Sequence, residues 1–278
     1  MLIRKIYRNL PSKYKEVAKK YYEYFNKSIN DFIFLLKFAF LIFIIVFRRK
    51  INSINFFERK IYSQNGEDGI IKMIFTKIGT LNKFCVEFGV GDAKENNTRY
   101  LIKKGHWHYL HMDTEVYPLA YSEIKREFIT TENVNSLFRK YNVPKEFDLL
   151  SIDIDYNTYW VWKAIKGYSP RLVVIEYNAS LPLSESKTVK YDPNAIWDGT
   201  NYFGASLLAL VNLGKSKGYT LIGCDNKGVN AFFIRDDLVA NHFVIKNIQE
   251  LWKPPQYGEK INGKYIGKKS SDKPFISV

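Results

Sequence analysis

The sequence is poor in the residues that build disulfide scaffolds and zinc sites. Its 278 residues include two cysteines, Cys85 and Cys224, and neither belongs to a CxxC pair or has a histidine at ligand spacing. Both lie in apolar runs, which is typical of small core residues in a reducing compartment. His106 and His108 stand two residues apart where an expected strand begins, and we expect them to bond to backbone rather than share a ligand. The sequence therefore offers no zinc site.

Acidic residues are scarce at both ends of the chain. Lys and Arg outnumber Asp and Glu by 14 to 4 in residues 1–60 and by 7 to 3 in 245–278, whereas residues 61–244 carry 21 of each. A nucleic-acid-binding protein normally carries its basic patch on the folded domain. The neutral middle therefore predicts no nucleic-acid partner. We divide the chain into a basic N-terminal region (1–60), a main domain (61–244) and a basic C-terminal tail (245–278), expected to extend along the surface.

One long apolar run, residues 32–47 (FIFLLKFAFLIFIIVF), lies in the basic N-terminal region. It is apolar on all sides, has one internal charge at Lys37, and is followed by Arg48, Arg49 and Lys50. At about 1.5 Å per residue it falls slightly short of a hydrocarbon core of roughly 30 Å. The lack of a small-residue cleavage site argues against a signal peptide. The run predicts a membrane anchor, or a helix in the membrane plane, at the anionic cytoplasmic face. The alternative is a buried helix of the globular domain.

From residue 61 onward the chain alternates apolar strands with helices. The strands are apolar on both faces, which is typical of a parallel sheet covered by helices. Two successive strands close the domain and predict an antiparallel hairpin at the sheet edge. The expected fold class is therefore α/β, Rossmann-like and doubly wound, with a mostly parallel sheet. The expected strands are 83–91, 107–113, 147–155, 171–178, 219–225 and 229–237, and the helices are 61–79, 97–105, 117–127, 133–140, 158–167 and 203–218.

The first strand ends in Glu87 and two glycines, Gly89 and Gly91. In an open parallel sheet, ligands bind at the carboxyl ends of the strands, and glycine lets the backbone approach them closely. The dinucleotide fingerprint G-x-G-x-x-G is not met, because Lys94 stands where its third glycine should fall. An acid beside this loop suits a cationic ligand such as a sulfonium better than a pyrophosphate. Asp113, which ends the second strand, can accept both hydroxyls of a ribose.

Between Tyr62 and about Leu238 the chain resembles the class I S-adenosylmethionine-dependent methyltransferases, and among them it is similar to the FkbM-type family. Tyr156 departs from the glycine common in that family, which bears on the acceptor site, and Ala93 replaces a frequent small turn residue. The segments that carry the resemblance are VEFGVG (86–91, like E-x-G-x-G), YLHMDT (109–114, like the second-strand acid), DLLSIDID (148–155, like D-L-x-x-I-D-x-E-G) and GVNAFFIR (228–235, like G-x-N-x-x-F).

The resemblance implies S-adenosylmethionine as cofactor. The residues for which it implies cofactor contacts are Glu87, Gly89, Gly91 and Asp113. For the adenine end, the loop before residue 134 offers Glu132 or Asn133 to the exocyclic amine. A surface helix N-cap is an equally good interpretation of Asn133.

The fourth and fifth strands end in polar residues, which neighbouring parallel strands should place in one crevice. These candidate catalytic residues are Asp153, Asp155, Glu176 and Asn178. One carboxylate with a raised pKa could remove the proton of an acceptor hydroxyl. Alternatively Asp153, Asp155 and Glu176 could hold Mg²⁺, which would lower the pKa of that hydroxyl. A third interpretation is that the acids cap helices or pair with Arg171 and nearby lysines.

The long loop at residues 184–206 carries aromatic residues interspersed with acids, a composition that suits a saccharide, and we expect it to form a substrate lid. The sequence therefore predicts a membrane-associated methyltransferase that uses S-adenosylmethionine to methylate oxygen on a sugar, or on a lipid-linked or surface-polysaccharide precursor. The alternatives are a nicotinamide-dependent oxidoreductase and a non-catalytic, membrane-tethered Rossmann-like binding module, and the second rests on Tyr156.

Overall fold

The computed structural model describes residues 11, 14–17, 19, 53–115, 122–240 and 242–278. The chain divides into two compact units, Met1–Ile51 and Asn52–Val278. In the first unit residues 14–17 are helical. The apolar run 32–47 lies outside the described residues. Among the residues that are described, no helix is both long and apolar enough to cross a membrane.

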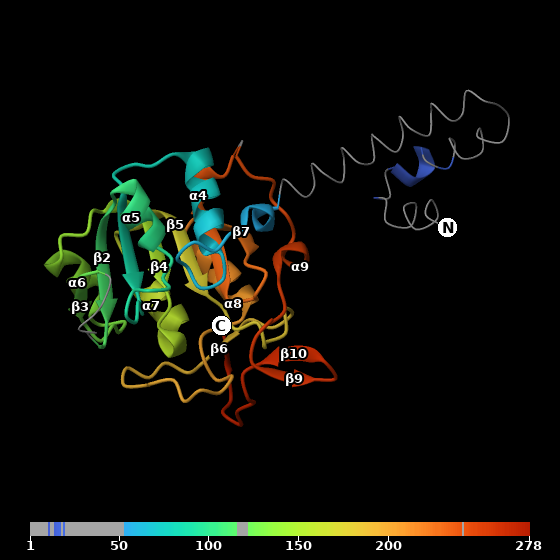
Figure 1. The fold of residues 1–278 in the computed structure, drawn as a ribbon. Coiled ribbons are helices and arrows are strands. Elements are labelled where there is room, and N and C mark those ends of the chain that lie inside the picture. Colours follow the sequence, from blue (N-terminus) through green and yellow to red (C-terminus); the bar gives the residue numbers. More distant parts are fainter. Residues whose placement is uncertain (1–10, 12–13, 18, 20–52, 116–121, 241) are drawn as a thin grey trace. The chain divides into compact units, whose positions relative to one another are not determined.

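The second unit is built on one seven-stranded sheet (Figure 1). Its strands are β1 (Phe84–Phe88), β2 (His108–Asp113), β3 (Ile124–Arg126), β4 (Glu146–Ile152), β5 (Ser169–Glu176), β7 (Tyr219–Cys224) and β8 (Asn230–Arg235). Their order is β3-β2-β1-β4-β5-β8-β7, and β8 runs antiparallel to the other six strands. The predicted mostly parallel, Rossmann-like sheet is confirmed, and so is the final hairpin. Of that hairpin, however, only β7 lies at the edge, because β8 inserts between β5 and β7.

Helices cover both faces of the sheet (Figure 1). They are α4 (Glu67–Ile78), α5 (Arg99–Gly105), α6 (Val134–Lys140), α7 (Thr158–Ala164), α8 (Leu207–Ser216) and α9 (Ile248–Leu251), with short 3₁₀ turns η1 (Ile54–Phe57), η2 (Asp155–Asn157) and η3 (Asp236–Leu238). Alternate strand residues enter two apolar cores. One core joins α6, α7 and α8 to residues such as Val173, and the other joins α4 to residues such as Val174 and Phe232. We call the side of the second core the α4 face.

The helix expected over 117–127 is wrong for the part that the structure describes. Residues 124–126 form β3, in which Ile124 pairs with His111. Ile124 is the buried apolar residue of this strand. One buried side chain followed by partly exposed Lys125 and exposed Arg126 suits a short edge strand, where tertiary pairing overrides local preference.

The C-terminal tail folds back onto the main domain, where the sequence led us to expect an extended surface segment. It forms a hairpin of β9 (Glu259–Ile261) and β10 (Lys264–Gly267), followed by β11 (Ile276–Ser277). β11 pairs antiparallel with β6 (Lys187–Thr188), a short strand within the long loop. The tail and the long loop are thereby tied together.

One buried carboxylate, that of Asp148 on β4, holds the amino ends of the central strands together. Its oxygens bind the backbone N–H groups of Leu81, Asn82 and Lys83 at 2.7–3.0 Å, and Arg171 Nε lies at 3.3 Å. A single side chain therefore connects β4, the entry to β1 and β5.

Replacement of Asp148 by alanine should lower the free energy of unfolding by about 3 kcal/mol, because it leaves three N–H donors and a guanidinium without their buried acceptor. Urea unfolding followed by circular dichroism measures this. The exposed Asp272→Ala change is the control and should stay within about 0.5 kcal/mol of the parent. Equal midpoints for the two variants would contradict the role of Asp148.

Candidate functional site

Acidic side chains gather on the α4 face at the carboxyl ends of the central strands. Strand alternation explains this, because Glu87 follows Cys85 by two residues and Glu176 follows Val174 by two, and both apolar residues lie in the α4-face core. Parallel strands end at the same edge, so the residues just beyond β4 arrive at the same place.

Three of the four predicted catalytic residues come together there. One carboxylate oxygen from each of Asp153, Asp155 and Glu176 lies within 4.8 Å of the others. We call this group the acid triad. Asp155 reaches it from the first residue of η2 with a left-handed backbone, φ +53°, a conformation that Asp tolerates better than most residues. Among the described residues, the acid triad is the group of His, Cys, Asp and Glu with the geometry to hold a metal ion.

The acid triad is short of positive charge. Burial, and then the charge of Asp155, raises the pKa of Asp153 to about 8. Burial and the charges of Asp153 and Asp155 hold the pKa of Glu176 well above its usual range. Burial also raises the pKa of Asp155, against the opposing effect of Lys268. The site therefore favours either a bound proton or a cationic ligand.

Asn178, the fourth predicted catalytic residue, is held by hydrogen bonds of its own. It is fully buried, and its Nδ2 donates to the carbonyl oxygens of Asn201 at 2.7 Å and Phe203 at 2.9 Å. Its Oδ1 accepts from the backbone N–H of Ser180. Its amide is thus occupied at the base of the long loop in this structure, and its contact with an acceptor stays a prediction. The sequence placed it correctly at the end of β5 but could not show which groups its amide would meet.

Glu87 faces its own loop. The buried carboxylate accepts hydrogen bonds from Asn96 Nδ2 at 2.7 Å, Asn97 N at 2.8 Å, Thr98 Oγ1 at 2.6 Å and Thr98 N at 3.1 Å, and from Ser151 Oγ at 3.2 Å. Burial raises its pKa, and these hydrogen bonds oppose the increase. Glu87 therefore shapes the loop after β1, and the residues that hold it were not predicted from the sequence. The adjoining polar residues in ENNT (95–98) were the available signal.

The two glycines after β1 serve different needs. A Cβ at Gly89 would lie 1.5 Å from the carbonyl oxygen of Asp153, so this glycine is required by the close packing of β1 against the end of β4. A Cβ at Gly91 would meet nothing within 4 Å. The N–H of Gly91 donates to Asp113 Oδ2 at 2.8 Å, which brings the acid of β2 beside the open glycine. Gly91 and Asp113 thus form the part of the predicted cofactor site that is open to a ligand.

Asn133 closes its own loop in the structure. Its Oδ1 accepts from the N–H of Thr130 at 2.8 Å, and its Nδ2 donates to the Phe128 carbonyl at 2.7 Å. It is the N-cap residue of α6 but makes no side-chain hydrogen bond to that helix. Beside it, Glu132 accepts from the hydroxyl of Tyr191 at 2.5 Å. The amide of Asn133 is therefore occupied in this conformation, and its contact with adenine stays a prediction.

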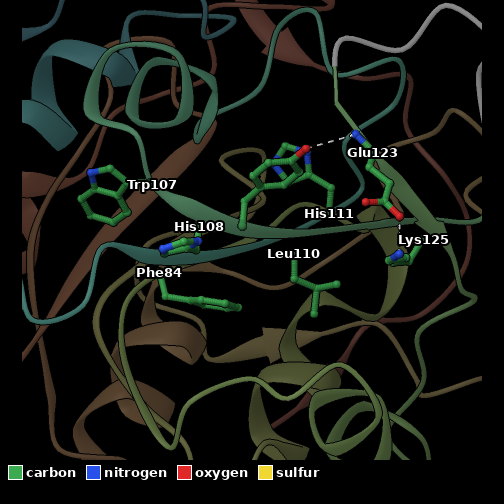
Figure 2. A pocket seen from close by; sticks show the side chains of 8 residues that line it. Phe84, Trp107, His108, Leu110, His111, Glu123 and Lys125 are labelled. Carbon is green, nitrogen blue, oxygen red and sulfur yellow. Dashed lines mark hydrogen bonds and ion pairs between the residues drawn. The ribbon is translucent and has the colours of Figure 1, made fainter.

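His106 and His108 lie in different elements, because β2 begins only at His108. His106 is the left-handed C-cap of α5, whereas His108 is the first residue of β2, so they share no strand face. His108 lines a groove of about 360 Å³ along β2, together with Trp107, Tyr109 and Lys125 (Figure 2). That groove contains no member of the acid triad.

His111, farther along β2, is buried, and burial lowers its pKa to about 3. Its ring nitrogens lie 2.7 Å from Thr98 Oγ1 and 2.6 Å from Ser122 Oγ. A neutral imidazole therefore links β2 to the loop that holds Glu87.

The long loop contacts both the C-terminal tail and Tyr156. Asn201 N donates to the Lys269 carbonyl at 2.8 Å, and Tyr202 OH donates to the Pro274 carbonyl at 3.1 Å. The ring of Tyr156, which follows Asp155 in sequence, lies 5.6 Å from that of Tyr202 in an edge-on contact. Lys268 of the tail lies over the Trp197 ring at 4.8 Å. The lid role of this loop stays a prediction.

Comparison with known proteins adds little to this geometry. No family model matches the chain, and no curated protein matches it. A solved structure described as a SAM dependent methyltransferase from Aquifex aeolicus is similar at 8% identity and a TM-score of 0.28, covering 59% of this chain and 89% of that one. An identity and a TM-score this low carry no inference about activity. The resemblance to the FkbM-type family stays a prediction.

Asp225 is a buried acid outside the acid triad. Its titration should make the free energy of unfolding depend on pH. Burial, and then the charge of Glu67, raises its pKa to about 7 from a usual value of 3.8. The folded chain thus holds this proton more tightly than the unfolded chain, and binds more protons between about pH 4 and pH 7. The free energy of unfolding should therefore fall as the pH rises through that range.

Urea unfolding at several pH values between about 4.5 and about 7.5, in a buffer that contains a chelator, should show this decline. The Asp225→Asn variant should show a shallower one, by up to about 1.4 kcal/mol per pH unit, because the titrating group is gone. Asp272→Asn, at an exposed position, should keep the parental slope. A parental slope in Asp225→Asn would show that Asp225 does not carry the effect.

Proposed function

We propose that this chain is an S-adenosylmethionine-dependent methyltransferase that methylates an oxygen atom of a sugar or of a lipid-linked glycan precursor. The observation that supports this most is the grouping of an open turn and several acids at the carboxyl ends of the strands. There the open turn at Gly91 adjoins Asp113, and none of the ion pairs among the described residues involves the acid triad. A sulfonium cofactor carries positive charge and a ribose, and this grouping offers an acceptor for each.

The residues present fit such a cofactor. The space beside Gly91 allows close backbone approach, and Asp113 keeps the N–H of Gly91 in place while it lies where ribose hydroxyls would be bound. When bound, S-adenosylmethionine supplies a methyl group on a positively charged sulfur. The chain's own task is to orient an acceptor hydroxyl toward that methyl group and to take its proton.

The acid triad can assist removal of that proton in two ways. In the first, Asp153 would be the base, since a pKa of about 8 lets it take up a proton near neutral pH and release it again. In the second, the three carboxylates would hold Mg²⁺, which would lower the pKa of the acceptor hydroxyl so that water takes its proton. In both, the same residues would orient the acceptor oxygen, and the cofactor would supply the methyl group.

The acceptor class rests on two further features. The aromatic residues of the long loop and the tail lie close together, with Tyr202 5.0 Å from Phe275 and Trp197 5.8 Å from Phe203, measured between ring centroids. Tyr202 and Phe203 are buried, whereas Trp197 and Phe275 are partly exposed, so these two rings could pack against the apolar face of a sugar. The apolar run 32–47 is the basis for proposing the cytoplasmic face of a membrane, with its anionic surface, as the site of action.

Calorimetry with S-adenosylmethionine on the full chain tests the cofactor assignment. The Gly91→Asn variant places a side chain in the open space while it keeps a residue type that tolerates the left-handed backbone at φ +53°. We expect the parent to bind and this variant to bind at least about tenfold more weakly, which corresponds to about 1.4 kcal/mol.

The matched control is Gly167→Asn. Gly167 also has a positive φ, +71°, and a Cβ there would meet nothing within 4 Å, but it precedes β5, at the amino ends of the parallel strands. The control variant should bind S-adenosylmethionine like the parent. A folded parent that binds no S-adenosylmethionine would end the methyltransferase proposal.

The membrane proposal predicts that deletion of residues 32–47 moves the chain from the membrane pellet to the supernatant on cell fractionation, because the run provides most of the apolar surface available for insertion. The double variant Arg48→Gln with Arg49→Gln removes two positive charges that flank the run, and it should loosen attachment without abolishing it. A parent found wholly in the supernatant would refute membrane attachment.

A further inference from the structure

Two oxygen atoms beside the acid triad are buried without any hydrogen-bond partner. They are Glu176 Oε2 and Asn230 Oδ1. Their residues face each other directly in the antiparallel pair of β5 and β8. Residues opposed in such a pair project from the same side of the sheet. That side is the α4 face, because Val174 and Phe232, two residues away on each strand, lie in its core.

The orientation of Asn230 is fixed by its donor end. Nδ2 donates to Glu67 Oε1 at 2.9 Å, and Glu67 is the fully buried first residue of α4. Glu67 is held in turn by the N–H of Asn65 at 2.8 Å. Since one end of the amide is committed to Glu67, the other end must point away from it. Asn230 is only 4% exposed, so Oδ1 has no access to bulk water to replace a partner.

We infer that Asn230 provides the fourth oxygen ligand of a divalent-cation site whose other ligands are Asp153, Asp155 and Glu176. Carboxylate and amide oxygens are the ligands preferred by Mg²⁺, Mn²⁺ and Ca²⁺. A cation among them would satisfy both orphaned oxygens and offset the mutual repulsion of the carboxylates. The remaining coordination positions are left for water or an acceptor hydroxyl.

The lysine that acts on this cluster does not replace such a cation. Lys268 opposes the increase in the pKa of Asp155 and of Glu176, so its charge is felt there. Its ammonium group lies over the ring of Trp197, at 4.8 Å from the ring centroid. Among the ion pairs formed by described residues, none joins Lys268 to the acid triad. The two orphaned oxygens therefore keep their need for a cation.

This inference rests on the same site as the proposed function, but cation binding can be measured without cofactor or acceptor. The probe is Mn²⁺, titrated into the metal-free full chain and followed by electron paramagnetic resonance, which reports free and bound Mn²⁺ separately. The informative variant is Asn230→Leu, because it removes the oxygen without altering any charge. A purely electrostatic attraction of cations to the acids predicts no change in this variant, whereas loss of a ligand predicts weaker binding.

We expect one Mn²⁺ per parent chain and at least about tenfold weaker binding by Asn230→Leu, on the scale of losses seen when a metal site is altered. Asn230→Asp restores an oxygen at the same position and should bind at least as tightly as the parent. If Asn230→Leu fails to fold, Asn230→Ser replaces it, since the serine hydroxyl is too short to reach the cation but leaves a polar group toward Glu67. Circular dichroism establishes which variants are folded.

Saturable binding that is lost in folded Asn230→Leu or Asn230→Ser and regained in Asn230→Asp supports the site. Parental affinity in a folded variant without the oxygen would overturn the role of Asn230. No saturable Mn²⁺ binding by the parent would overturn the site itself. S-adenosylmethionine calorimetry on the same metal-free samples separates the two proposals, because cofactor binding without Mn²⁺ binding ends the cation site alone, and the reverse ends the proposed function alone.

Discussion

Repulsion among carboxylates at one end of the sheet is the constraint on which the site depends. Two unit charges about 4 Å apart repel each other by about 4 kcal/mol at the effective dielectric of a protein edge. The acid triad keeps three carboxylates at about this separation. The two apolar cores, one on each face, anchor the strands and hold the acids in place despite this cost. An arrangement held against such repulsion favours whatever brings positive charge to it.

Asp148 and Glu87 differ from the acid triad in how completely their carboxylate oxygens are hydrogen-bonded. Asp148 at one end of the sheet and Glu87 at the other are both buried, and both accept several hydrogen bonds from nearby backbone. Glu176 is on the same face as Glu87, yet one of its oxygens is buried with no donor. Since an unpartnered buried acceptor costs free energy, evolution of a merely structural position would be expected to remove it. The contrast is consistent with a stabilising role for Asp148 and Glu87 and with the proposed catalytic role for Glu176.

The sequence predicted the mostly parallel sheet, the alternation of strands and helices along the chain, and the meeting of three acids, because these follow from local rules. Apolar runs identify buried strands, and parallel strands end together. It failed where the answer depends on a distant partner. The role of Asn178 depends on the carbonyl groups of Asn201 and Phe203, and that of Glu87 on residues 96–98 folding back over it. β3 was mistaken for a helix because pairing with β2 decides its conformation.

The role of Asn230 also depends on a partner that is distant in sequence. The sequence placed it in the final hairpin but gave no reason to connect it with Glu176, because that contact requires β8 to lie inside the sheet rather than at its edge. The inserted antiparallel strand therefore does more than extend the sheet. β8 brings the neutral amide oxygen of Asn230 next to Glu176, where another carboxylate would increase the repulsion within the acid triad.

Charge balance explains why the group at this position should be neutral. Three ionised carboxylates carry three negative charges, a divalent cation offsets two of them, and a sulfonium beside the site offsets the third. An aspartate at position 230 would leave one negative charge over, close to the buried carboxylate of Glu67. An asparagine completes the ligands and keeps the balance. The cation and the cofactor would then favour each other's binding, since each relieves repulsion that the other leaves, and this coupling connects the two proposals through one physical cause.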